Sequence, residues 1–342
     1  MATIIDLSQF ADTFKGQTLK DINQLVSEKL LELSDFSKLA TVFDDTVFNA
    51  ELGFIGDGGL IGKAGFPTGD SIPNDDYSLK VRKVTFEPKQ WGARLLIDYT
   101  SFITNCGVYA LNKGCRIADL QDTDIMEVLI DSIARAIIKF QWRLYWFNNT
   151  QITVAESETI GDLKTGTDKG YFNIIDGFFA QMLKQIENNA SQKVTYNGSD
   201  IAKTLEDLYF NASITLRDQP DQIILCTQSF ADQYRKMLSS KGELESMLAN
   251  LENGKKVLTY QGVMLQPIKV WDEIIANYFD TQAPKHRAVF TAKSVLGCAT
   301  DSMDSFKNFN IFYDNFRRQT FVDIAGKADC KLLNPEMFVY AY

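Results

Sequence analysis

Few side chains in this sequence could support acid–base or nucleophilic chemistry. The chain has one histidine, His286, in polar sequence close to Pro284 and Arg287. Any Ser-His-Asp or Cys-His site would have to use this residue, and the sequence has no Gly-x-Ser-x-Gly nucleophile elbow. We therefore interpret His286 as an exposed loop residue and predict no catalytic site around it.

Carboxylates and cysteines also lack the spacing that catalysis or metal binding requires. The pairs Asp44-Asp45 and Asp75-Asp76 lie in loop-like sequence, whereas glycosidase and metal sites need buried carboxylates that converge. The five cysteines include no Cys-x-x-Cys pair, which argues against zinc and indicates free thiols in a reducing compartment. They are Cys106, Cys115, Cys226, Cys298 and Cys330. We predict no enzymatic activity, no metal and no cofactor.

Composition argues against two further classes of protein. The 342 residues carry a net charge of −9 and no Lys/Arg-rich run, so the basic face that sequence-specific nucleic-acid binding needs is not expected. No basic start is followed by an apolar run. No stretch approaches the ~20 apolar residues of a membrane span. We predict a chain that is made and kept in a cytoplasm, without a membrane partner.

Residues 77–98 carry the pattern of a long two-armed hairpin. Apolar and polar residues alternate on both sides of a turn at 87–90, and arms of about ten residues could reach roughly 30 Å. The apolar set moves from odd to even positions in the first arm, which implies a bulge near Arg82-Lys83. Because an isolated hairpin is marginal in water, we expect a partner to cover it, and another copy of the chain could do so.

Two helices and a glycine-rich strap surround this hairpin in the sequence. Residues 1–50 have apolar residues at helical spacing and predict an amphipathic arm, either docked on its own core or reaching a neighbour. Residues 53–74 predict an extended strap without a phosphate-binding pattern. Residues 119–148 predict the longest helix, which Asp124 and Glu127 begin as a capping box. Its length would be roughly 37 Å.

The second half of the chain alternates helix and strand signals. Ser229 is the expected cap of one helix, and Pro267 predicts that its strand lies at a sheet edge. The last residues, 308–342, alternate enough for two or three strands, and the chain ends in a strand pattern. Helices are expected in 173–188, 201–213 and 229–238, and strands in 222–226, 257–270 and 286–297.

The order of these parts resembles the major capsid proteins of tailed phages. Residues 260–264 leading to 270–273 are similar to that family's strand, glycine, strand and return, and 287–290 begins a strand like the one that follows. The ending 333–339 (LNPEMFV) resembles the family's closing strand, with Met337 in place of the usual small residue. The resemblance covers nearly the whole chain, and this ending is its most specific part.

The resemblance implies an α+β fold of the tailed-phage major capsid type. That fold has an N-terminal arm, an extended β-hairpin loop, a peripheral domain with a long spine helix and β-sheet, and an axial α/β domain. Carried onto this chain, each implied part takes a range of residues. They are an arm at 1–52, a strap and hairpin loop at 53–105, a peripheral domain at 106–170 with its spine helix at 122–148, an axial domain at 171–300, and return strands of both domains at 301–342.

The resemblance also implies a function. The chain would be a structural head protein that self-assembles, as pentamers and hexamers, into an icosahedral shell around double-stranded DNA. Assembly would take place in the bacterial host cytoplasm, with scaffolding, portal and decoration proteins as further partners and no sequence-specific grip on the DNA. The expected inter-subunit contacts are Val84, Phe86, Trp91, Arg94 and Leu95. Two alternatives remain open: an encapsulin-type compartment, which shares the fold, and an α+β enzyme with an unrecognised site.

Overall fold

The computed structural model describes most of the chain beyond its N-terminal arm. Statements about structure below concern these residues: 39–46, 49–56, 80–97, 136–156, 161–242, 248–250, 256–300, 310–314 and 319–342. The arm helix predicted within 1–50 lies almost wholly outside this part of the chain, as does the first half of the predicted spine helix.

The second half of the spine helix is present as predicted. Residues 136–142 are α-helical, and η2 (Arg143–Phe147) continues them as a wider π-helical turn. Ile137, Leu144 and Phe147 are buried, as their spacing of three and four residues predicted. Phe147, the last residue of η2, packs against Phe179, and their ring centroids are 5.1 Å apart. This helix end therefore forms part of the hydrophobic core.

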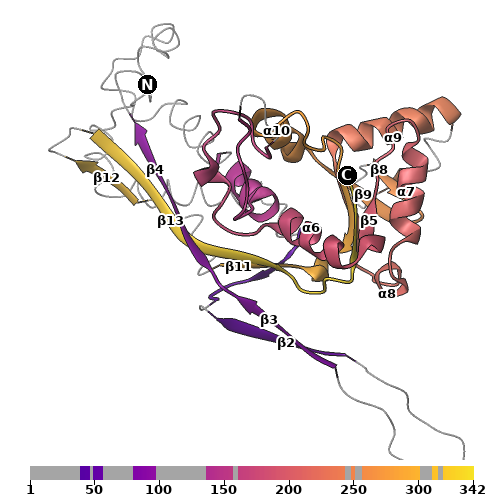
Figure 1. The fold of residues 1–342 in the computed structure, drawn as a ribbon, viewed down its shortest axis with the longest axis horizontal. Helices are drawn as coiled ribbons and strands as arrows, with labels where there is room; N and C mark the ends of the chain where they lie inside the picture. Colours follow the sequence, from indigo (N-terminus) through magenta and orange to yellow (C-terminus); the bar gives the residue numbers. More distant parts are fainter. Residues whose placement is uncertain are drawn as a thin grey trace, which may run out of the picture.

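A seven-stranded mixed sheet forms one half of the body (Figure 1). Every residue of β10 and nearly every residue of β6 is buried, because helices cover both faces, as their continuous apolar sequence indicates. The strands, in sheet order, are β5 (Lys193–Val194), β14 (Phe338–Ala341), β10 (Ala288–Ala292), β6 (Gln222–Thr227), β9 (Val263–Ile268), β8 (Lys256–Tyr260) and β7 (Leu248–Asn250).

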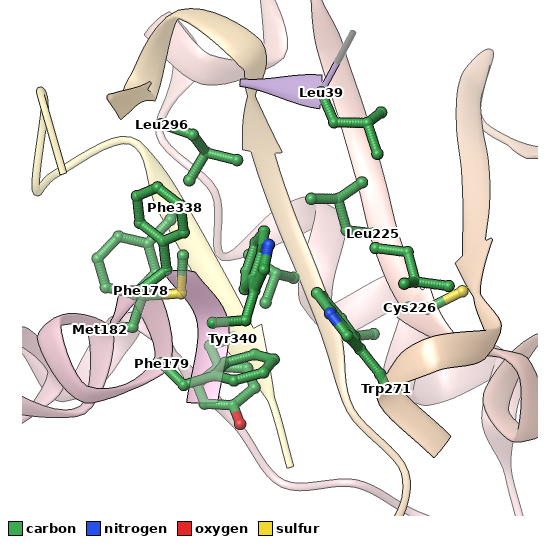
Figure 2. Close-up of a cluster of buried hydrophobic side chains, with 14 of the residues drawn as sticks. Leu39, Phe178, Phe179, Met182, Leu225, Cys226, Trp271, Leu296, Phe338 and Tyr340 are labelled. Carbon is green, nitrogen blue, oxygen red and sulfur yellow. The ribbon is translucent and has the colours of Figure 1, made fainter. Parts of the chain in front are cut away.

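Helices pack around this sheet and supply the aromatic core. Figure 2 shows Phe178 and Phe179 beside Phe338 and Tyr340, with Trp271 close by. Phe179 stacks on Tyr340 at 5.2 Å and meets the edge of Trp271 at 4.9 Å. The helices are α6 (Phe178–Asn188), α7 (Ile201–Phe210), α8 (Ile214–Arg217), α9 (Gln228–Lys241) and α10 (Lys269–Tyr278), with the short turns η3 (Lys169–Tyr171), η4 (Ala190–Gln192) and η6 (Lys293–Val295).

A second sheet of five strands is organised around one long strand. β13 (Gln319–Leu332) pairs with β4 (Lys89–Ile97) along one edge and with β12 (Asn310–Asp314) and β11 (Leu296–Thr300) along the other. β1 (Thr41–Phe43) adds to β11 in parallel. At about 3.3 Å per residue, the 14 residues of β13 span roughly 46 Å. Figure 1 shows this strand crossing the molecule as a curved band.

The hairpin predicted at 77–98 is the main error of the sequence analysis. Both of its strands exist, but β3 (Lys80–Phe86) pairs with β2 (Ala50–Gly56), whereas β4 pairs with β13. Only Glu87 and Pro88 separate β3 from β4, and a two-residue hairpin needs positive φ in its turn. Proline holds φ near −65°, and Glu87 is not among the described residues with positive φ. The chain therefore turns a corner there and passes into another sheet.

Three smaller predictions need correction. The register of β2 and β3 runs without interruption through Arg82 and Lys83, so no bulge is present there. Residues 286–297 form two strands in different sheets, β10 and β11, because η6 turns the chain between them. Pro267 lies in β9, which is an interior strand. Its missing N–H costs no bond to β8, since that strand pairs with β9 only at Val263 and Met264.

The cap of α9 also differs from the prediction. The helix begins at Gln228, one residue before the expected cap Ser229, and its N-cap residue Thr227 makes no side-chain capping bond. Asp272 of α10 takes this role from a distance: its carboxylate accepts the Gln228 N–H at 2.6 Å and the Ser229 N–H at 3.2 Å. A carboxylate at this position also favours the positive end of the helix dipole.

Candidate functional site: the projecting hairpin

The most unusual part of the described molecule is the two-stranded sheet of β2 and β3. Figure 1 shows these strands projecting away from the two larger sheets. Their antiparallel register runs from Ala50 opposite Phe86, next to the body, to Gly56 opposite Lys80. A two-stranded ribbon has two faces and cannot bury both by itself. What each face contacts therefore decides what the ribbon can do.

The inner face of the ribbon is packed on the molecule's own body. Phe86 is almost fully buried in a small cluster with Ala299 of β11 and Leu333, which follows β13. Leu52 and Val84, which are directly opposite each other in the register, pack against this cluster. Phe43 and Phe54 pack against it as well. The even-numbered apolar residues of β3 thus attach the base of the ribbon to the five-stranded sheet.

Polar contacts fix the base of the ribbon at the corner between β3 and β4. Asp329 of β13 accepts the Glu87 N–H at 2.7 Å, and its other oxygen accepts the N–H of Cys330 at 2.8 Å. Asp329 is only 4% exposed, and burial raises the pKa of its carboxyl. Arg82 donates to the Leu333 carbonyl and lies over the Phe54 ring. These partly or fully buried hydrogen bonds therefore hold the corner.

The outer face of the ribbon presents apolar side chains to solvent. Ile55 is 72% exposed and Val81 is 64% exposed, and the two are directly opposite each other across the strands. Nearer the base, Lys83 pairs with Glu51 at 2.8 Å, also in solvent. Single exposed apolar residues are common, but a cross-strand pair on a projecting ribbon forms a contiguous apolar surface. Such a surface is suited to contact with another protein.

The five residues predicted as contacts lie in different environments. Val84 and Phe86 belong to the inner cluster. Trp91 is 6% exposed and packs on Phe140 of the spine helix at 4.7 Å. Arg94 makes a two-pronged ion pair with Asp323 of β13, at 2.7 and 2.8 Å. The backbone of Leu95 pairs with Val322, and its side chain lies outside the description. Their contact with another subunit stays a prediction.

Sequence reasoning missed the exposed pair that the ribbon carries. Ile55 falls within the glycine-rich strap predicted at 53–74, although β2 extends through Gly56. The available signal was short: the apolar residues Leu52 and Phe54 alternate with Glu51 and Gly53, and the apolar Ile55 then breaks this period of two. Glycine density hid this alternation. Val81 falls in a strand that was predicted, but the expected contacts from this strand were Val84 and Phe86 on its other face.

The histidine is part of an ordered hydrogen-bond chain rather than an exposed loop. His286 is half-buried beside the Tyr196 ring at 4.9 Å, and its Nε2 lies 3.4 Å from Gln233 Nε2. Because the Gln233 amide oxygen accepts the Tyr196 hydroxyl, its nitrogen faces the imidazole and donates to Nε2. Nδ1 then carries the proton and donates to Ser229 Oγ at 2.9 Å.

This direction of donation differs from that of a serine activated by histidine. A histidine that activates serine must accept the hydroxyl proton. Here the imidazole donates to Ser229, whose hydroxyl in turn donates to Thr227 Oγ1 at 3.2 Å. Burial lowers the pKa of His286; Asp272 opposes this shift and Lys285 adds to it. The group is a neutral, structural imidazole in this arrangement.

One pocket of about 230 Å³ is lined in part by Pro284 and Arg287, which are close to His286 in the sequence. Its lining includes the aromatic rings of Phe147, Phe179 and Phe279, with Arg287 stacked on all three at 5.0 to 5.7 Å. The Arg287 Nε donates to Pro284 O at 3.0 Å. The cation thus serves to hold the helices and sheet together. Within the described residues, no cluster of three or more potential metal ligands is found, and no helix there is long and apolar enough to cross a membrane.

Together, these parts form an α+β fold of two large sheets from which a two-stranded ribbon projects. The described part of the chain contains a projecting ribbon, the second half of a spine helix, a helix-covered sheet and a long curved strand. No family model and no curated protein sequence matches the chain. Solved structures do match, and they show that the fold is that of the tailed-phage major capsid proteins.

Two of these structures carry the comparison. The chain is similar to a chain of the satellite phage P4 procapsid that includes the size determination (Sid) protein, with 12% identity, a TM-score of 0.50, and coverage of 93% of this chain and 98% of that one. It is similar to a chain of Gordonia phage Cozz with 12% identity, a TM-score of 0.53, and coverage of 90% and 85%. A virus-like particle from Pyrococcus furiosus is less similar, with 8% identity, a TM-score of 0.43, and coverage of 94% and 98%.

Proposed function

We propose that this chain is the major capsid protein of a tailed phage, the repeated subunit of an icosahedral shell around double-stranded DNA. The observation that carries the proposal is the β2–β3 ribbon. Its inner face is attached to its own subunit and its outer face exposes Ile55 and Val81. In a closed symmetric assembly, a modest apolar contact of this kind is repeated in every subunit.

The charge and the chemistry of the chain fit this role. A net charge of −9 without a Lys/Arg-rich run does not favour a tight grip on phosphates, so packaged DNA would remain mobile against the shell wall. We infer no enzymatic activity, since the one imidazole is oriented for structure. Pentamers and hexamers, scaffolding, portal and decoration partners, and assembly in the bacterial host cytoplasm belong to this proposal. So does the division into arm, hairpin loop, peripheral and axial domains.

The first test removes the ribbon without disturbing the body. The register places Phe54 opposite Arg82, and both belong to the base of the ribbon, so residues 55–81 can be replaced by Asn-Gly, which favours a tight two-residue hairpin turn. We expect the variant to fold with unchanged helix and strand content, and to remain as free subunits or capsomers where the full chain gives megadalton particles. Negative-stain images and size-exclusion chromatography measure both. Normal heads from this variant would contradict the proposed role of the ribbon.

A point variant sharpens the same test. Ile55→Lys with Val81→Lys places two charges on the outer face, which would have to be desolvated in an apolar contact. We expect particle yield to fall at least tenfold. Lys83→Ser, on the same face but in the polar part of the ribbon, is the matched control and should assemble normally. Equal yields from both variants would place the contact elsewhere.

Assembly state also separates the alternatives. An enzyme of this size would run as a monomer or small oligomer at micromolar concentration. An encapsulin-type compartment would form particles that lack a portal and contain a cargo protein bound through a docking peptide. Mass spectrometry of purified particles tests this: portal and packaged DNA support the phage head, whereas a co-purifying enzyme with a shared terminal peptide supports the compartment.

A further inference from the structure

Two buried cysteines face each other across the five-stranded sheet. In the antiparallel pair β11–β13, Cys298 lies directly opposite Cys330. Both are free thiols and almost completely buried. Directly opposed residues in an antiparallel pair point to the same face of the sheet. The two sulfur atoms therefore lie on one side, in the main core.

The alternation of hydrogen-bonded and non-hydrogen-bonded residue pairs along β11 and β13 defines the geometry of this pair. Leu333 N–H donates to Val295 O at 2.8 Å, one step beyond the pair Leu296–Leu332. Val295 and Leu333 are thus a hydrogen-bonded pair, and the two pair types alternate along an antiparallel ladder. Three steps further along, Cys298–Cys330 is a non-hydrogen-bonded pair. Such pairs have the closer Cα atoms, about 4.5 Å apart, which lies within the range of roughly 4.4–6.8 Å that disulfides require.

The surroundings keep each thiol protonated. Cys330 Sγ lies 3.4 Å from the Asp176 carbonyl and 3.7 Å from the Tyr145 carbonyl, under α6 and η2. Burial raises the pKa of both thiols well above the usual range, and Cys330 itself contributes to the shift at Cys298. A thiol in this state reacts slowly with solutes. Once one sulfur is oxidised, however, the Cα spacing typical of such a pair allows the other sulfur to bond to it.

We propose that Cys298 and Cys330 form a redox site that a peroxide converts into a cross-strand disulfide. One thiolate attacks the peroxide: an S–O bond forms, the O–O bond breaks, and the leaving oxygen takes a proton as water. The second thiol attacks the sulfenic sulfur: the S–S bond forms, the S–O bond breaks, and its proton leaves in a second water. Two thiols and one hydrogen peroxide thus give one disulfide and two waters. The sulfurs are oxidised and the peroxide oxygens are reduced.

The consequence would be a covalent link under the ribbon. β11 and β13 carry, on their other face, Ala299 and Asp329, which hold the base of β2 and β3. A disulfide would fix these strands to each other and close the chain segment that contains β12 into a loop, which restricts the unfolded chain. The inference rests on the sheet geometry and is independent of the proposed shell function.

The test is peptide mapping of the native full-length chain after treatment with hydrogen peroxide. Cys106→Ser and Cys115→Ser remove the two thiols that lie outside the described residues. We expect one linked pair of peptides containing Cys298 and Cys330, lighter by two hydrogens and released by a phosphine reductant. The unfolding temperature should rise on oxidation and return on reduction. If that background folds poorly, the same mapping on the unaltered chain gives the answer, since the peptides are resolved individually.

Matched variants separate this site from general oxidation. Cys298→Ala and Cys330→Ala should each abolish the linked peptide and the temperature shift. Cys226→Ala removes an equally buried thiol whose sheet neighbours are Ala288 and Pro267, and both signals should persist. Sulfinic or sulfonic acid at Cys298 or Cys330 without the link would overturn the proposal. So would links that involve Cys226, or a link that forms only in denatured protein.

Discussion

At the scale of single residues, side chains that suggest chemistry serve structure in this molecule. His286 and Ser229 are 2.9 Å apart, a distance that would suit a catalytic pair. The neighbours decide otherwise: Gln233 donates to one imidazole nitrogen, which makes the other a donor toward Ser229. Only the neutral imidazole satisfies both bonds. A residue type therefore indicates chemistry only when its hydrogen-bond partners are known.

The His286 arrangement predicts a pH-dependent stability. Burial lowers the folded-state pKa of this group below its ordinary value near 6.5. Between those two values the unfolded chain binds more protons, so the free energy of unfolding should fall as pH decreases below about 6.5, by at most about 1.4 kcal/mol per pH unit for one proton. Above that pH the contribution should be complete. Urea unfolding followed by tryptophan fluorescence from pH 7.5 to 5.5 measures this slope.

Since His286 is the only histidine in the chain, a substitution isolates its contribution. His286→Gln should flatten the profile in that window, because the amide can both accept and donate but does not titrate there. Carboxylates contribute at lower pH in both proteins. A variant whose slope equals that of the parent would assign the proton to another group.

At the scale of elements, two short connections show how turn chemistry decides strand pairing. Gln261 and Gly262 have φ of 50° and 81° and join β8 to β9 in a tight hairpin, as the sequence predicted. Glu87-Pro88 joins β3 to β4 across an equally short gap, yet the strands pair elsewhere. The difference is the proline, whose ring excludes the φ that a tight hairpin needs. Alternating hydrophobicity predicts where the strands lie, and the residues between two strands determine whether those strands pair with each other.

The corner at Glu87 yields a prediction about the attachment of the ribbon. Asp329→Ala would leave the N–H groups of Glu87 and Cys330 without their acceptor. Because the Cys330 bond is buried, we expect a loss of about 1–3 kcal/mol in the free energy of unfolding. Hydrogen exchange should show faster exchange at the Glu87 amide. Asp329→Asn keeps one of the two acceptor oxygens and should lose less stability than Asp329→Ala.

Asp323→Ala is the matched control, because it removes a carboxylate from the same strand. Its ion pair with Arg94 lies at the surface, where solvent screens such pairs and their contribution is small. We expect a clearly smaller loss of stability than for Asp329→Ala. Equal losses in the two variants would mean that the corner bond does not hold the ribbon.

At the scale of the whole molecule, two neighbouring crossings join the sheets. η6 carries the chain from β10 to β11, and the segment after β13 returns it to β14. The crossings contact each other through Leu333 N–H and Val295 O. Gln181 of α6 adds a bridge, since its amide donates to Cys330 O and accepts the Leu332 N–H at 3.0 Å. The ribbon is therefore attached to a body whose two sheets are held together.

The overall charge predicts how assembly responds to salt. Subunits with a net charge of −9 repel one another when they gather, whereas the apolar contact expected at Ile55 and Val81 is not weakened by screening. Raising NaCl from about 0.05 to about 0.5 M shortens the range of repulsion, so the fraction of protein in particles should increase. Analytical ultracentrifugation measures this fraction. A decrease with salt would show that ion pairs between subunits dominate assembly.

Local rules in the sequence determined much of this protein. Apolar spacing gave the described half of the spine helix, the strands β6, β8 and β9, and the closing strands, because periods of 3.6 and two are read directly from side-chain order. The order of parts and the LNPEMFV ending indicated the capsid fold. The lone histidine, the scattered cysteines and the acidic charge argued, by residue type and spacing alone, against catalysis, metal binding and base reading.

Tertiary structure alone decided which strands are neighbours and which faces remain open. β4 pairs with a strand more than 200 residues away in sequence, as its ion pair between Arg94 and Asp323 reflects. The same long-range pairing places Cys298 against Cys330 and buries Trp91, which the sequence pattern had suggested for an interface. The physical reason is that strand pairing depends on backbone bonds and packing between distant segments, and local periodicity specifies only which side chains share a face.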